Sequence, residues 1–166
     1  MLISQWKKIA VMLSATFLLA VNAEAIMAGE HNHHSHGPEK QAQLSLNNGK
    51  KWVTDENLRQ AMARIRDVLE ADLHVIHSGK ATPEQYRALA QKTHDQVTFI
   101  TGNCKLEQKT DTMFHIVLAD IIAGAEAMSG QDGKAARKGA EKLARALENY
   151  GAYFDHPGWQ GAKRSH

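Results

Sequence analysis

The stretch TPEQYRALAQKTHDQVTFI, residues 82–100, carries both a helix start and a helical pattern. Thr82 is suited to be the N-cap and Pro83 to be the first helical residue, and Gln85 completes a capping box with Thr82. After this start, core-type side chains recur at spacings of three and four residues, which places them on one face of a helix. The predicted buried face comprises Tyr86, Leu89, Ala90, Thr93, Val97 and Ile100.

Three further segments have the same pattern. One begins at Thr54 as N-cap, and the next is capped by Thr110 or Asp111. The last runs from about Lys134 to Tyr153. Because each helix has roughly 20 residues and the turns are short, consecutive helices are expected to run antiparallel. The sequence therefore predicts an all-α fold, an up-down-up-down antiparallel four-helix bundle behind a disordered N-terminal leader.

Residues 1–25 have the three parts of a secretory signal peptide. Lys7 and Lys8 precede an apolar run of 13 residues, and the small-x-small pattern AEA at 23–25 ends the segment. The run is shorter than the roughly 20 residues that span a bilayer, and no second such run follows. We expect a soluble exported protein, periplasmic or secreted, with no membrane span after signal cleavage.

A histidine cluster follows the signal peptide, in a polar leader at residues 26–51 that lacks an apolar period. Such a composition predicts a flexible segment. Several imidazoles on a flexible segment can gather around one copper or zinc ion. The alternative interpretation is a hydrophilic leader whose histidines bind metal without that being their role. The stretch GEHNHHSHGPEK supplies the candidate metal ligands His31, His33, His34 and His36.

The position of signal cleavage changes the chemistry of the new N-terminus. The AEA pattern favours cleavage after Ala25. Cleavage after Ala28 would instead leave Gly29-Glu30-His31 at the N-terminus. Its free amine, two backbone amides and imidazole can then form a square-planar set for Cu(II) or Ni(II).

The predicted bundle and its C-terminal end hold weaker candidate metal ligands. Cys104 is the single cysteine, so it is a buried small hydrophobe, an intermolecular bridge or a metal ligand. His115 meets Cys104 only if the turn between the second and third helices folds back. His156 lies in the aromatic segment NYGAYFDHPGW, residues 149–159. We interpret this segment as a cap over one end of the bundle or as a docking surface.

Charge and motifs indicate neither nucleic-acid binding nor catalysis. The formal net charge is +2, and removal of Lys7, Lys8 and Glu24 with the signal peptide lowers it by one unit. This balance does not call for a nucleic-acid partner. The chain shows no Ser-His-Asp arrangement, no His-Glu-x-x-His helix and no di-iron pattern of Glu-x-x-His pairs. We therefore expect that the protein is not an enzyme.

The first predicted helix resembles that of cytochrome b562. In ENLRQAMARIRDVLEA, residues 56–71, Leu58 precedes Met62 by four residues, as a Leu precedes the axial Met in that family. The segments FHIVLADIIAGAEAM, residues 114–128, and GAEKLARALENYGAYF, residues 139–154, are similar in apolar register to its closing helices. The resemblance implies a four-helix bundle, and it implies Met62 as an axial ligand if haem binds.

The resemblance breaks at the second haem ligand. The family has a histidine on its last helix, and Gly151 stands at the matching position here. Glycine has no ligand atom, and the chain lacks a Cys-x-x-Cys-His attachment motif, so haem is not expected. The chain also resembles DnrO-like small exported proteins, through its histidine-bearing leader, the pattern LR...M...IR at 58–66 and three further motifs. This second resemblance implies the same architecture and export. The three further motifs are GKKW at 49–52, NCKL at 103–106 and YFDHPGW at 153–159.

Three hypotheses follow from these patterns. The first is an exported four-helix-bundle protein that binds a transition metal, copper by preference, through its leader. The second is a haem-b electron-transfer protein of the cytochrome b562 type. The third is an interaction module without metal, whose partner is another exported protein or a second copy in a homodimer. The predicted segments are the signal peptide 1–25, the leader 26–51, the bundle 52–159 and the tail 160–166.

Overall fold

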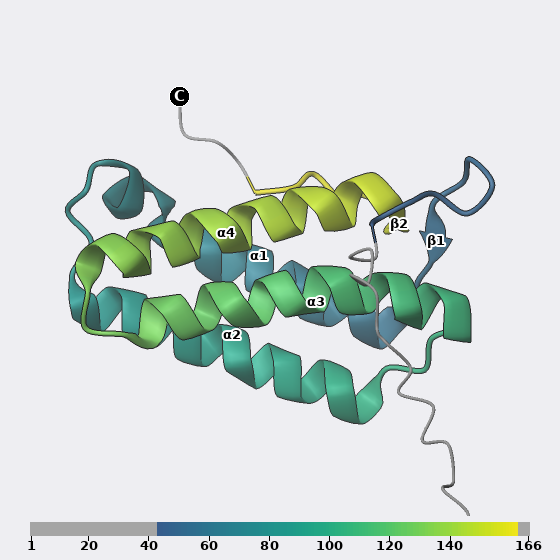
Figure 1. Ribbon diagram of the computed structural model, residues 1–166, viewed down its shortest axis with the longest axis horizontal. Coiled ribbons are helices and arrows are strands. Elements are labelled where there is room, and N and C mark those ends of the chain that lie inside the picture. The colour runs from purple at the N-terminus through teal and green to yellow at the C-terminus, as the bar shows by residue number, and fades with distance from the viewer. Residues whose placement is uncertain (1–42, 163–166) are drawn as a thin grey trace, which may run out of the picture. The chain divides into compact units, whose positions relative to one another are not determined.

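The computed structural model describes residues 43–162, and this part of the chain is helical apart from two short strands (Figure 1). The four helices confirm the predicted all-helical class. The predicted signal peptide, the histidine cluster and the last four residues lie outside the described residues. In chain order the elements are β1 (Trp52–Val53), α1 (Glu56–His77), α2 (Pro83–Asn103), α3 (Gln108–Ser129), α4 (Gly133–Tyr153) and β2 (Phe154–Asp155).

Helix α2 begins as the sequence predicts. The Thr82 hydroxyl accepts the backbone N–H of Gln85 at 3.2 Å, and Gln85 Oε1 accepts the backbone N–H of Thr82 at 2.9 Å. These two bonds form the capping box, with Pro83 as the first helical residue. Of the predicted buried face, Val97 is half-buried. The fully buried members are Tyr86, Leu89, Ala90, Thr93 and Ile100.

Helix α1 has a different cap from the predicted one. Asp55 is the N-cap, because its Oδ1 accepts the backbone N–H of Leu58 at 2.7 Å. The hydroxyl of Thr54 instead donates to the backbone carbonyl of Asp155. The prediction of Thr54 as N-cap is therefore wrong by one residue, since a contact distant in sequence occupies its hydroxyl.

Helix α3 starts earlier than predicted. Glu107 is the N-cap, and its Oε2 accepts the backbone N–H groups of Lys109 at 3.2 Å and Thr110 at 3.4 Å. Thr110 is a buried residue of the first turn, so the prediction that Thr110 or Asp111 caps this helix is wrong. Glutamate is not among the residues preferred at an N-cap, which is why the pattern pointed to Thr110 and Asp111.

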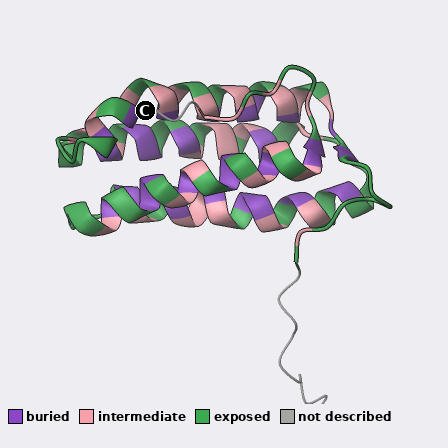
Figure 2. Cartoon of the chain, turned by 90° about the horizontal axis from the view of Figure 1, so that it is seen from above, coloured by how far each residue is buried: buried purple, intermediate pink, exposed green. Residues whose placement is uncertain are grey.

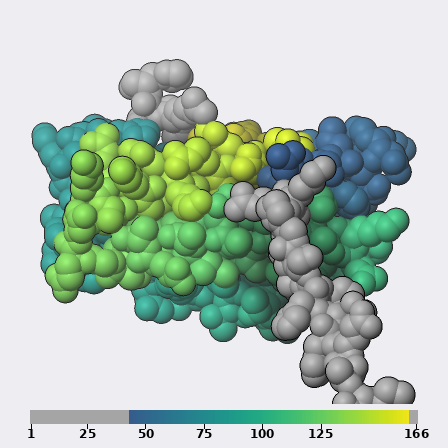
Figure 3. Space-filling model, in the orientation of Figure 1, coloured from purple at the N-terminus to yellow at the C-terminus, as the bar shows by residue number. Residues whose placement is uncertain are grey.

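Helices α3 and α4 make the most extensive contact between elements. A Cβ placed on Gly139 of α4 would lie 2.5 Å from the backbone carbonyl oxygen of Gly124 in α3. The two helix backbones thus approach as closely as glycine permits. On the face seen in Figure 3, atoms of α3 and α4 meet along the two helices. Beside this contact, Lys142 of α4 pairs with Asp120 of α3 at 2.5 Å.

Buried residues lie mostly on the sides of the helices that face one another (Figure 2). This alternation of buried and exposed positions is the amphipathic pattern read from the sequence. The largest fully buried side chains are Tyr150, Phe114, Phe154, Leu58, Met62, Ile65, Leu69, Leu89, Ile121, Met128, Leu143 and Leu147.

The two short strands bring the segment before α1 beside the segment after α4 (Figure 1). They pair in parallel, with Trp52 opposite Phe154 and Val53 opposite Asp155. The indole N–H of Trp52 also donates to the backbone carbonyl of Ser45 at 2.6 Å. The start of the first helix and the end of the last one are therefore tied together.

Residues 43–51, which the sequence pattern assigns to the leader, contain a tight turn. Asn47 and Lys50 exchange backbone hydrogen bonds of 2.8 and 3.0 Å. The two residues between them have positive φ angles, +50° at Asn48 and +82° at Gly49. Asn-Gly is the residue pair that tolerates this geometry best in a two-residue turn.

Within residues 43–162, one helix, α3, is long and apolar enough to meet the criterion for crossing a membrane, with a mean hydropathy of 1.3. Core helices of soluble proteins meet the same criterion. Helix α3 packs against α2 and α4. Its buried side chains include Phe114, Val117, Leu118, Ile121 and Met128.

Candidate functional site

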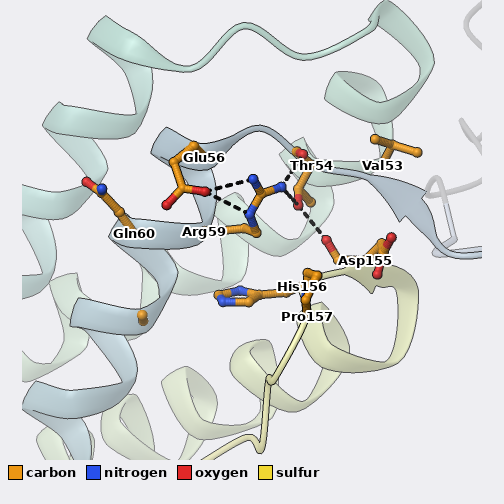
Figure 4. A pocket seen from close by; sticks show the side chains of 9 residues that line it. Val53, Thr54, Glu56, Arg59, Gln60, Asp155, His156 and Pro157 are labelled. Atoms are coloured by element: carbon orange, nitrogen blue, oxygen red, sulfur yellow. Dashed lines mark hydrogen bonds and ion pairs between the residues drawn. The ribbon is translucent and has the colours of Figure 1, made fainter.

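A pocket of about 500 Å³ lies where β1, the start of α1 and the segment after β2 meet (Figure 4). This volume is within the range of small-molecule sites. Val53, at its wall, is 72% exposed and is the most exposed large apolar side chain among the described residues. The pocket is lined by Val53, Thr54, Glu56, Arg59, Gln60, Ala63, Asp155, His156 and Pro157.

Arg59 is fixed at one wall of this pocket. Its Nη2 donates to Glu56 Oε2 at 2.8 Å, and its Nη1 donates to the backbone carbonyl of Thr54 at 2.6 Å. The Thr54 hydroxyl in turn donates to the backbone carbonyl of Asp155 (Figure 4). Arg59 therefore links the first turn of α1 to Thr54, which in turn is bonded to β2.

His156 lies at another wall of the pocket, with its ring close to Arg59 (Figure 4). Its Nδ1 and the hydroxyl of Tyr150 are hydrogen-bonded at 3.0 Å. Burial lowers the pKa of His156 from its usual 6.5, and the guanidinium groups of Arg59 and Arg66 lower it further. The imidazole is therefore neutral at pH 7, with Nδ1 engaged by the protein.

The aromatic side chains of the C-terminal segment pack on one another. Tyr150 stacks on Phe154 with ring centroids 5.5 Å apart, and Phe114 meets both rings edge-on. Trp159 meets Tyr150 edge-on at 4.9 Å. Burial raises the pKa of Tyr150, so its hydroxyl stays protonated and can donate a hydrogen bond. Tyr150 and Phe154 are fully buried, so they contribute to the core and not to an exposed docking surface.

Gly151, which matches the haem-ligand position of the resembling family, is covered by the indole of Trp159. A Cβ on Gly151 would lie 2.5 Å from Trp159 Cδ1, and closer still to Nε1. The backbone carbonyl of Gly151 accepts a hydrogen bond from Lys51 Nζ at 2.5 Å. The indole of Trp159 thus packs directly on Gly151. Met62, the other position that the haem resemblance implies, is fully buried in the core.

A second hollow, of about 250 Å³, has Cys104 and His115 in its wall. Cys104 is the half-buried C-cap of α2 and lies beside Asp55, the N-cap of α1. The pKa of Cys104 is raised to about 12, chiefly by burial and further by the nearby Asp55 and Asp111 carboxylates. Metals bind the thiolate, so these surroundings oppose metal binding by Cys104.

The described metal candidates from the sequence fall into two places. Cys104 and His115 line the hollow at the end of α2, whereas His156 lines the pocket beside β1. The exposed His115 has its Nδ1 2.8 Å from the backbone carbonyl oxygen of Asp111. In the part of the chain that the structure describes, no three His, Cys, Asp or Glu side chains form a group that could hold a metal ion. The four leader histidines at 31–36 lie outside that part.

Sequence patterns gave no signal for Arg59 and Arg66. Both occupy the polar side of an amphipathic helix, where a charged residue is ordinary. Their place beside His156 depends on how the segment after β2 folds back, and there the Arg66 guanidinium lies 5.2 Å from the ring centroid of Trp159. The one sequence signal for this arrangement is Gly151, a glycine late in a helix, with Trp159 a few residues after it.

Comparison of the chain with protein-family models, with curated proteins and with solved structures finds no match. The resemblances to cytochrome b562 and to DnrO-like proteins thus stay predictions from sequence motifs.

Proposed function

We propose that this protein is an exported, periplasmic or secreted, four-helix-bundle protein that binds a transition metal, copper by preference or zinc, through its leader. The observation that carries the proposal is the presence of four histidines within the six residues 31–36. Neutral imidazole is a common ligand for copper and zinc. Because the four are close in sequence, one ion can gather them by closing short loops, which costs little entropy.

In this proposal the helical part is a body that carries the leader and is not an enzyme. Among the described residues, the weaker candidates Cys104, His115 and His156 are not part of a group that could hold a metal ion. A partner would be another exported protein or a second copy of this chain. Sedimentation velocity with metal and with chelator separates these cases, since a metal-linked homodimer dissociates when the metal is removed.

The arrangement we propose for the bundle is up-down-up-down and antiparallel. Asn57 Nδ2, at the start of α1, donates to the backbone carbonyl of Asn103, at the end of α2, at 2.9 Å. The β1–β2 pair likewise sets the start of α1 beside the end of α4. Both contacts are those expected when neighbouring helices run in opposite directions.

The contact between α3 and α4 supports the same arrangement. A Cβ on Gly124 would meet the backbone of Gly139 and Leu143, and a Cβ on Gly139 would meet the backbone of Gly124 and Met128. On α3, Gly124 precedes Met128. Gly124 lies beside Leu143 of α4, whereas Met128 lies beside Gly139, which precedes Leu143. Moving forward along α3 means moving backward along α4, which is an antiparallel register.

The geometry at Gly151 disfavours the haem alternative. A haem of the cytochrome b562 type needs a second axial ligand at this position, where the chain has no ligand atom. The space next to Gly151 is taken by the indole of Trp159, and Met62 is buried in the core. The residues present do not fit the group that the resemblance implies.

The metal proposal is tested by replacing His31, His33, His34 and His36 with alanine in the otherwise complete chain. We expect the parent chain to take up one Cu(II) or Zn(II) in isothermal titration calorimetry, and the quadruple variant to lose that uptake. A chain that begins at Gln41 should behave like the quadruple variant. Undiminished uptake in both altered chains would overturn the proposal.

A matched control removes two other histidines. His74→Ala and His115→Ala change exposed positions on α1 and α3. This double variant should keep the metal uptake of the parent, because the proposal assigns no role to either imidazole. Equal losses in the control and in the quadruple variant would mean that the uptake belongs to histidines in general.

Haemin titration tests the alternative. We expect no Soret band to develop with the parent chain. A band that appears with the parent and disappears with Met62→Leu would favour the haem carrier instead.

A further inference from the structure

The side of α4 that faces α1 is closed mainly by a segment that is not helical. Helix α4 makes far fewer direct contacts with α1 than with α3. Residues 156–162, which we call the strap, follow β2 and run back alongside α4 (Figure 1). The strap and α1 together line two hollows, and the strap also packs on α4. It therefore lies between α1 and α4, where the two helices would otherwise be in direct contact.

Trp159 is the anchor of the strap. On the side of α4, its indole covers Gly151 and meets the ring of Tyr150 at 4.9 Å. On the side of α1, the Arg66 guanidinium lies 5.2 Å from its ring centroid. His156 adds a hydrogen bond to Tyr150. A few side chains of the strap thus supply its contacts to both helices.

The hydrogen bonding of the Trp159 side chain is incomplete. The indole Nε1 of Trp159 is buried and has no hydrogen-bond partner. A buried donor without an acceptor is destabilising relative to its hydrated state, and this cost is relieved when the donor reaches water. The other described tryptophan, Trp52, donates its indole N–H to the carbonyl of Ser45. The two indoles of the described chain therefore differ in how firmly they are held.

Two hollows lie between the strap and α1. One is the pocket of about 500 Å³ lined by Arg59, His156 and Pro157, and the other has about 230 Å³ and is lined by Arg66 and Gly158 among others. The backbone of the strap also turns through glycines with positive φ, Gly158 at +77° and Gly161 at +68°. Few packed contacts and nearby empty space are features of segments that open locally.

We propose that the strap is a latch that opens and closes as a unit on the folded helices, with Trp159 as its anchor. Opening joins the two hollows into one groove between α1 and α4 and exposes the ring of Tyr150. Phe154 stays in place, because it is fully buried and stacked on Tyr150. Access to this side of the bundle is thereby controlled by the C-terminal segment.

The first test compares the indoles of Trp159 and Trp52, two of the three in the complete chain. In the ¹⁵N-labelled protein, with each indole resonance assigned by Trp→Phe variants, hydrogen exchange with water is measured at Nε1. We expect the Trp159 indole to exchange at least tenfold faster than that of Trp52, because latch opening exposes it while the helices stay folded. Equal exchange rates would overturn the proposal.

The second test opens the latch by design. In Gly151→Ala the new methyl occupies the place of the indole, so the Trp159 resonance should move to the position of an exposed tryptophan while that of Trp52 stays. Gly102→Ala is the control, since a Cβ there meets nothing within 4 Å. An unmoved Trp159 resonance, or movement of both indoles with loss of the folded spectrum, would show that the strap is not a separable latch.

Discussion

Helix α4 is packed in two different ways on its two sides. Toward α3, Gly139 lets one helix backbone meet another at Gly124. Toward α1, Gly151 receives the indole of Trp159, which comes from a segment outside the helices. A methyl added at the first contact must push two helices apart, whereas a methyl added at the second displaces a side chain that has room to leave. The side of α4 at Gly139 is therefore rigid, because it packs against a helix backbone. We call the side at Gly151 the yielding side, because the side chain that covers it can move away.

The largest effect is expected from Gly139→Ala. Its Cβ would lie 2.5 Å from the Gly124 carbonyl oxygen and 2.9 Å from Ala127 Cβ. Overpacking costs about 1–3 kcal/mol and occasionally more, against a gain in helix propensity of about 1 kcal/mol. Because the clash is with a backbone atom, we take the upper end of this range, and we expect a net loss of roughly 2 kcal/mol in the free energy of unfolding, measured by urea denaturation. Gly102→Ala is the matched control, and a Gly139→Ala protein as stable as that control would contradict the assignment of a rigid contact.

A smaller effect is expected from Gly151→Ala, of roughly 1 kcal/mol, because the indole can leave its seat. The same substitution in a Trp159→Ala background should be neutral or stabilising, since the methyl then has space and alanine favours the helix. The coupling free energy from this double-mutant cycle measures the contact directly. Additive effects of the two substitutions would mean that the methyl and the indole do not compete.

Mild acid should weaken the yielding side selectively. The pKa of His156 is lowered in the folded protein, so the unfolded chain binds the proton more tightly and stability falls as pH drops below about 6.5. Above that pH the contribution is constant, because the imidazole is neutral in both states. Arg59 and Arg66 disfavour the proton, while Glu56 and Asp155 partly compensate.

This pH effect is measured by thermal unfolding between pH 7.5 and 5, with His156→Gln as the control. The variant lacks the titrating group and should show a flatter dependence over that range. Its loss of stability should stay below that of Gly151→Ala, because His156 is only partly buried. A variant with the same pH profile as the parent would assign the acid sensitivity to another group.

The smallest effect is expected from Lys142→Ala on the rigid side. Its ammonium pairs with Asp120 of α3, but both side chains are 39% exposed. Exposed ion pairs contribute about 0.2–1 kcal/mol and are screened by salt. We expect a loss within that range at low salt that shrinks in 1 M NaCl, measured by urea denaturation. A salt-independent loss would indicate lost packing instead of lost charge.

Local signals made much of the helical part predictable. The capping box of Thr82 and Gln85 and the core-type spacing that follows gave both the start and the buried face of α2. The caps of α1 and α3 were misplaced for a physical reason. The hydroxyl of Thr54 is engaged by the distant Asp155, and Glu107 serves as a cap although its residue type is rarely chosen for one.

The candidate site was less predictable, because it depends on contacts between segments far apart in sequence. Sequence patterns identified His156 and the aromatic segment around it, but not the arginines that lower its pKa. The lack of a ligand atom at Gly151 was readable, whereas the indole that fills its place was not. That indole reaches Gly151 through a turn with no helical or strand period, so no spacing rule relates the two positions.

The parallel pair of β1 and β2 has a topological consequence. It sets Trp52 opposite Phe154, so the polypeptide enters and leaves the helical part at neighbouring points. Such proximity favours circular permutation. A linker from residue 162 to residue 43, with new termini opened in the exposed turn at 130–132, should leave the order of contacts among the helices unchanged. We therefore expect the permuted chain to keep its four helices. Far-ultraviolet circular dichroism should then show the same helical content as in the parent chain.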